Sequence, residues 1–232
     1  MNDTTCKSDD FDMAAAVTRS LLGWGVVAGV WYLTVGIILG LTRDGFAFSK
    51  HPLSVLMLGD YGWLQQTNII LAGVMVIAAA VGFLRAMRPA RWAGGLIAGF
   101  GVCLIASGVF PPDPMAGFPA GASEGQASVS GLLHLAFGAV GFLLLAAAAF
   151  VVARWYAARA DASVARNSRI AGAVIALAFV AGAALSASAA GVLILWIAVV
   201  AAWAWLAALS ISTYRTVPHP DCSRAVPDTA HP

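Results

Sequence analysis

The sequence predicts an all-α, polytopic membrane protein: a bundle of six transmembrane helices with both termini in the cytoplasm. The first observation behind this prediction is composition, because 60% of the 232 residues are hydrophobic and only 10% are charged. A soluble domain carries about 25% charged residues, so these few charges could not cover a surface exposed to water. The second observation is a series of apolar runs, each long enough to cross the hydrocarbon core of a bilayer.

Each spanning helix needs about 20 mostly apolar residues. Six segments qualify, and they lie at about Leu21–Leu41, Trp63–Leu84, Trp92–Phe110, Val129–Ala153, Ile170–Leu185 and Gly191–Ser212. Only residues 186–191 divide the last two segments, and the combined run is about twice the length of one crossing, which favours a tight hairpin. We therefore expect a cytoplasmic segment at 1–20 that is not a cleaved signal peptide, a transmembrane domain at 21–213, and a disordered cytoplasmic tail at 214–232.

The distribution of positive charge predicts the orientation of the bundle. With these segments, 11 of the 13 Lys and Arg residues fall on the side of the two termini. The other side holds only Arg43 and Lys50. Cytoplasmic loops carry an excess of Lys and Arg, so the termini are expected inside and the loop at about residues 42–62 outside.

Glycine pairs four residues apart occur in two of the expected helices. Such pairs let helix backbones approach closely in lipid, where dispersion drives helix association. We expect them to pack helices within the chain; the alternative is a homo-oligomer formed through the same faces. The pairs are Gly25 with Gly29, Gly36 with Gly40, and Gly95 with Gly99.

Polar side chains gather at the expected outer ends of the helices, and we take them as candidate ligand-binding residues. Most lie between residues 51 and 68, and the remaining two lie at the end of the third helix and the start of the fourth. An ionisable side chain inside a spanning segment is costly, which makes the histidine of the fourth helix the strongest candidate. The candidates are His51, Ser54, Asp60, Gln66, Asn68, Asp113 and His134.

Several chemistries remain open for these residues. His51, Asp113 and His134 would supply the His/His/carboxylate set of a catalytic zinc, although their spacing matches no zinc signature, and no other cofactor is expected. An Asp–His pair would instead position a general base. The amide side chains would also serve as interhelical hydrogen bonds, and each histidine could be purely structural. No catalytic residue is identified, and Cys6, Cys103 and Cys222 show no metal-ligand spacing.

Short motifs along the chain resemble a known family. They run from Arg43-Asp44-Gly45 to His51-Pro52-Leu53-Ser54, continue at Trp63-Leu64-Gln65-Gln66 and at residues 108–113, and end at His134. This pattern, over roughly residues 20–210, resembles the bacterial and archaeal membrane family called domain of unknown function 998. The resemblance implies a six-helix membrane protein and adds no activity.

These observations favour an integral protein of the bacterial cytoplasmic membrane with an outward-facing polar pocket. We expect the pocket to bind a membrane lipid headgroup or another amphipathic ligand, and we expect no nucleic acid partner. The alternative is a metal-dependent or Asp/His-assisted hydrolase or transferase that acts on a lipid-linked substrate. A small transporter is a second alternative, but the cytoplasmic half of the bundle offers no polar lining and no midplane proline break.

Overall fold

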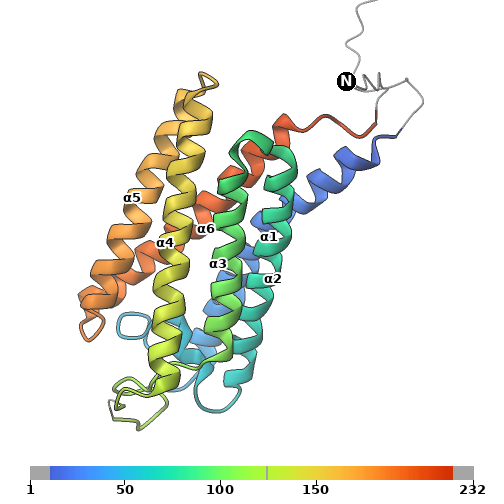
Figure 1. Ribbon diagram of the computed structural model, residues 1–232. Helices are drawn as coiled ribbons and strands as arrows, with labels where there is room; N and C mark the ends of the chain where they lie inside the picture. Colours follow the sequence, from blue (N-terminus) through green and yellow to red (C-terminus); the bar gives the residue numbers. More distant parts are fainter. Residues whose placement is uncertain (1–10, 124, 222–232) are drawn as a thin grey trace, which may run out of the picture.

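The computed structural model describes residues 11–123 and 125–221. Within these residues the chain forms six α-helices and two short 3-10 helices (Figure 1). In chain order these are α1 (Met13–Thr42), η1 (Leu53–Met57), α2 (Gly62–Ala86), η2 (Arg88–Ala90), α3 (Arg91–Val109), α4 (Val129–Ala157), α5 (Ala162–Ala184) and α6 (Ala189–Thr216).

The predicted all-α transmembrane architecture is confirmed. Each α-helix of the described chain is long and apolar enough to cross a membrane, α3 together with η2. Two helices begin earlier than their apolar runs. α1 starts at Met13 and not at Leu21, because the Asp12 carboxylate accepts a hydrogen bond from the Ala15 N–H at 2.9 Å and caps the helix there. Asp161 caps α5 in the same way.

A helix therefore extends beyond the hydrocarbon core as far as its capping residue, whereas the apolar run marks only the part of the helix that lies within the hydrocarbon core. At the other end of the chain, α6 extends to Thr216. The remainder of the expected disordered tail, residues 222–232, lies outside the described residues, as do Cys6 and Cys222.

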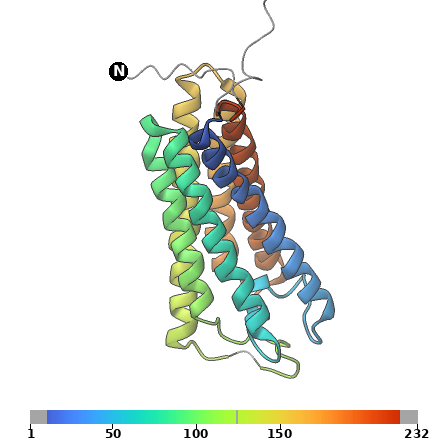
Figure 2. The same ribbon diagram turned by 90° about the vertical axis from the view of Figure 1, so that its right-hand side faces the viewer.

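The helices form a ring in which each one packs against its neighbours in sequence. α1 contacts α2, and this order continues to α6, which returns to contact α1. Figures 1 and 2 show the resulting bundle from two sides. α2 and α3 cross closely, and a Cβ built on Gly73 would lie 2.7 Å from the Gly101 carbonyl oxygen. This contact requires glycine because neither backbone leaves room for a side chain.

Other glycines close the ring between its first and last helices. A Cβ on Gly29 would lie 3.1 Å from the Cβ of Trp203 in α6, and a Cβ on Gly25 would overlap Ser210. Gly36 packs instead against Leu53 of η1, and Gly40 packs against Phe46 and Phe48 of the loop that follows α1. Most of the predicted glycine pairs therefore pack within the chain. Gly95 is different, because a Cβ there would meet only open space.

The two ends of the bundle differ. We call the end that carries η1 and the loop at residues 110–128 the η1 end, and the opposite end the terminal end. At the terminal end the described chain starts and finishes side by side, since the Asp12 N–H donates to the Pro220 carbonyl at 2.7 Å. The interior of that half is filled by large buried side chains, including Phe83, Met87, Leu145, Leu206 and Leu209.

Candidate functional site: a cavity at the η1 end

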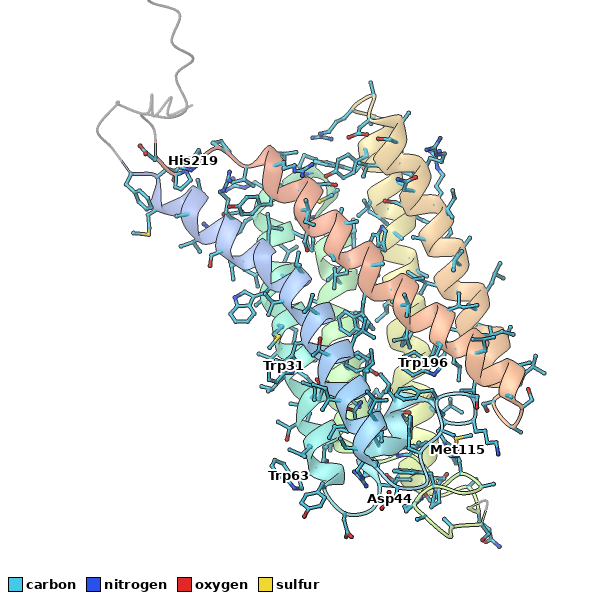
Figure 3. All side chains as sticks on the ribbon, turned by 180° about the vertical axis from the view of Figure 1, so that it is seen from behind. Trp31, Asp44, Trp63, Met115, Trp196 and His219 are labelled. Carbon is cyan, nitrogen blue, oxygen red and sulfur yellow. The ribbon has the colours of Figure 1, made fainter. Side chains whose placement is uncertain are left out.

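The interior of the ring is hollow toward the η1 end. A cavity of about 320 Å³ lies there, and its wall takes residues from every helix of the described ring. Tyr32, Phe100 and Trp203 belong to helix segments farther from the η1 end, whereas η1 and the loops after α1, α3 and α5 contribute the wall residues that lie outside the six α-helices. Figure 3 labels Trp196 and Met115, which line the cavity from α6 and from the loop after α3.

His134 of α4 lines this cavity and is held by the end of α3. The carbonyls in the last turn of a helix lack partners within the helix, and here two of them face the imidazole. The His134 Nδ1 atom lies 2.9 Å from the Ser107 carbonyl oxygen and 2.9 Å from that of Phe110. Because a carbonyl oxygen only accepts, Nδ1 must carry the hydrogen and donate it.

This arrangement fixes the chemistry of the second ring nitrogen. In the neutral ring the Nε2 atom of His134 is then a hydrogen-bond acceptor. It makes no hydrogen bond to the part of the chain that the structure describes. The result is an oriented imidazole whose accepting nitrogen is left for a group that occupies the cavity.

Asp113 also lines the cavity, where it caps the first turn of α4. One carboxylate oxygen accepts a hydrogen bond from the Ser128 N–H at 3.1 Å. The carboxylate packs directly on Gly131, where any Cβ would overlap it. A negative charge at a helix N-terminus is stabilised by the helix dipole, which explains an acidic residue at this position.

The hydroxyl groups of Ser54, Tyr32 and Ser186 complete the polar part of the wall. Ser54 lies in η1, where it is half-buried and makes no hydrogen bond among the described residues. Tyr32 of α1 is buried, and its hydroxyl likewise has no described partner. Apart from these groups, Asp113, Ser107 and His134, the wall is made almost wholly of aliphatic, aromatic and sulfur-containing side chains.

The structure does not place His51 in the cavity. Its side chain is 2% exposed and lies near the rings of Phe46 and Phe118. Nδ1 accepts the Ala47 N–H at 3.0 Å, and Nε2 lies 3.1 Å from the Ala116 carbonyl oxygen, to which it donates. Both nitrogens are therefore engaged, and the imidazole joins the loop after α1 to the loop after α3.

The remaining candidates lie elsewhere. Asn68 is buried between α1 and α2, where its Nδ2 donates to the Tyr32 carbonyl at 3.1 Å and to the Gln65 Oε1 at 3.0 Å. Gln66 is half-buried and Asp60 is exposed, and neither lines the cavity. Of the seven candidates, the structure brings three together around one space: Ser54, Asp113 and His134.

The predicted metal set and the predicted Asp–His pair are not formed. Among the described residues no group of three His, Cys, Asp or Glu side chains is placed to hold a metal ion. His51 fails as a ligand because both of its nitrogens are engaged. The His134 Nδ1 faces backbone carbonyls, and the hydrogen bond of Asp113 goes to the N-terminus of α4.

Sequence reasoning missed Tyr32, Cys103 and Ser107, which line the cavity from α1 and α3. Each is a small or amphipathic residue inside an apolar run, where no local pattern distinguishes it. Only the spatial placement of Ser107 beside His134 would have identified it: its hydroxyl oxygen lies 3.1 Å from Nδ1.

The fold and the cavity define the class: an integral membrane protein whose helical ring encloses a largely apolar site with a few polar groups. The chain belongs to the family described as protein of unknown function (DUF998), whose model matches residues 26–212. This match confirms the resemblance noted in the sequence. Neither the curated proteins nor the solved structures include a match to this chain.

Proposed function

We propose that this protein resides in the bacterial cytoplasmic membrane and binds an amphipathic lipid in the cavity at the η1 end. The observation that carries the proposal is the pairing of an apolar space inside a membrane bundle with the oriented, unpartnered Nε2 of His134. Ligand sites are commonly apolar pockets of about 300–1,000 Å³ with a few placed polar groups. At about 320 Å³ the cavity lies at the lower end of that range.

The proposed orientation places the η1 end away from the cytoplasm. Arg residues such as Arg88 and Arg154 lie at the terminal end, whereas Arg43 and Lys50 are at the η1 end. This asymmetry supports termini on the cytoplasmic side. The scarcity of Lys beside Arg supports a bacterial source with a GC-rich genome.

Lipid binding is supported over transport by the packing of the terminal half. Phe83, Leu145 and Leu206 are fully buried in the interior there. Transport sites are commonly formed by helices that are broken near the midplane, and the described α-helices continue unbroken through this depth. The cavity therefore fits a binding site in one half of the bundle better than a path through it.

The proposal can be tested by replacing a glycine of the cavity wall with a residue large enough to fill the cavity. Gly138 lines it, and a Cβ there would have ordinary contact with Phe179 at 3.8 Å, so Gly138→Phe should fold and occupy the space. Gly95→Phe is the matched control because a Cβ at Gly95 meets only open space. Native mass spectrometry of the full-length protein should find bound lipid in the wild type and in Gly95→Phe, and roughly tenfold less in Gly138→Phe. Equal lipid in all three would overturn the proposal.

A second candidate function is a hydrolase or transferase assisted by His134. The fixed Nδ1–H leaves Nε2 as a base, and the Ser54 hydroxyl shares the same cavity. His134→Asn keeps a donor for the α3 carbonyls and removes the base. If the enzyme hypothesis is correct, wild-type protein incubated with extracted membrane lipids should release a new product, and His134→Asn should not. Binding without product would leave the first proposal standing alone.

A further inference from the structure

Between Gly131 and Gly141, the half of α4 nearest the η1 end has no buried residue. Every residue from 132 to 140 is at least partly exposed, whereas Leu145, Ala149 and Val152 in the other half are fully buried. One face of this half lines the cavity and the other faces outward. α4 therefore separates the cavity from the surroundings of the bundle with a single layer of side chains.

α4 and α5 pack closely only toward the terminal end. There a Cβ on Gly172 of α5 would lie 3.1 Å from the Ala146 carbonyl oxygen. The last aromatic contact between the two helices is the stack of Phe142 on Phe179, with ring centroids 4.5 Å apart. Beyond this stack the helices diverge toward the η1 end, as Figure 1 shows.

Residues on both helices beyond the stack lie at the edge of the cavity. Leu135 of α4 lines the cavity and is 52% exposed. Ala183 of α5 also lines it and is half-buried. A side chain that faces the cavity and the outside at once marks an opening, and this opening lies on the lateral surface of a spanning bundle, where hydrocarbon surrounds it.

The polar groups of the wall restrict the head of any lipid that uses this opening. Nε2 of His134 and the Asp113 carboxylate both accept hydrogen bonds, and Ser54 can accept one as well. No Lys or Arg belongs to the described wall. A phosphate head would meet the Asp113 charge without a compensating cation, which is costly in a low-dielectric site. A hydroxyl head would donate to these acceptors without carrying charge.

We propose that the cavity takes a lipid with an uncharged, hydroxyl-bearing head, which enters sideways from the bilayer between the η1-end halves of α4 and α5. Its hydrocarbon chain would occupy the apolar interior beside Phe100 and Trp203. The proposal rests on lipid binding at this cavity and adds the class of lipid and its route.

The proposed preference for an uncharged headgroup can be tested with two lipids that have the same acyl chains. Full-length protein in nanodiscs receives either diacylglycerol or phosphatidic acid, and native mass spectrometry measures occupancy. Diacylglycerol should bind roughly tenfold more tightly than phosphatidic acid. The Asp113→Asn substitution should increase the affinity for phosphatidic acid and so reduce the difference in affinity between the two lipids. Phosphatidic acid that binds as well as diacylglycerol would overturn the assignment of the head.

The route is tested with two leucines of α4. Leu135→Trp narrows the opening, and Leu132→Trp is the matched control because Leu132 is 57% exposed and does not line the cavity. Exchange of deuterated diacylglycerol should slow roughly tenfold in Leu135→Trp and remain at the wild-type rate in Leu132→Trp. The same exchange measurement can be made on α5, where Ala183→Trp narrows the opening and Ala184→Trp is the control because Ala184 does not line the cavity.

The outcomes separate the two proposals. Equal exchange rates in Leu135→Trp and Leu132→Trp, repeated in the alanine pair, would overturn the lateral route while lipid binding stands. Wild-type protein that retains neither lipid, nor any lipid from its own membrane, would overturn lipid binding itself.

Discussion

At the scale of single residues, two histidines that were both candidate ligand-binding residues have different roles. His51 uses both ring nitrogens on backbone groups of two loops, and His134 uses only Nδ1. The difference arises from their partners, because Ala47 offers an N–H to one nitrogen of His51 and Ala116 a carbonyl oxygen to the other, whereas the groups at the end of α3 all face the Nδ1 atom of His134. The sequence identified both histidines as candidates, but it could not predict which of their ring nitrogens would be left without a hydrogen-bond partner.

His51→Ala is expected to destabilise the protein without removing a cavity group. The substitution deletes two hydrogen bonds and a buried ring beside Phe46 and Phe118, a loss of about 1–3 kcal/mol. Thermal unfolding in detergent measures the change, with His219→Ala as the control because His219 is exposed at the terminal end. An unchanged midpoint for His51→Ala would show that the imidazole does not hold the two loops.

At the scale of elements, helix pairs are positioned by small residues and helix ends by caps. The α2–α3 crossing depends on Gly73 and Gly101, whose backbones approach each other directly. These two glycines are not four apart in one helix, so the usual spacing does not reveal them. The apolar runs predicted each helix, whereas the starts at Met13 and Ala162 follow from caps that a hydropathy argument does not weigh.

Gly73→Ala is expected to separate α2 from α3. The added Cβ would lie 2.7 Å from a backbone oxygen that cannot rotate away, so we expect a loss of about 1–3 kcal/mol. Gly95→Ala adds the same methyl group to α3 in open space and should be neutral or slightly stabilising. Denaturation midpoints of the two variants in the same detergent provide the comparison. Equal midpoints would mean that the crossing tolerates a side chain.

At the scale of the whole molecule, the sequence predicted the number and type of the helices of the described chain but not their ring. Hydropathy shows how long each membrane-spanning segment is, but it does not show which helices pack against each other. The ring decides the site, because it places Tyr32 of α1 and His134 of α4 around one cavity. His51 is held outside that cavity by backbone groups of two loops, so it does not join Asp113 and His134 in the predicted metal set.

The orientation of the bundle is predicted by its charges and can be tested with cysteines. In a chain with Cys6→Ser, Cys103→Ala and Cys222→Ser, Asp60→Cys should react with a membrane-impermeant maleimide added to intact cells. Ala158→Cys should react only after the membrane is opened. Both sites are exposed and lie at opposite ends of the bundle. The reverse labelling pattern would place the η1 end in the cytoplasm.

The contact between α1 and α6 also determines when the ring can close during biosynthesis. Helices leave the ribosome in chain order, so α1 waits for its second neighbour until the final span has been synthesised. Until then, the face of α1 with Gly25 and Gly29 meets lipid and not Ser210 and Trp203. The cavity at the η1 end consequently forms only in the completed chain. A nascent protein that lacks α6 has no enclosed space in which to bind a lipid.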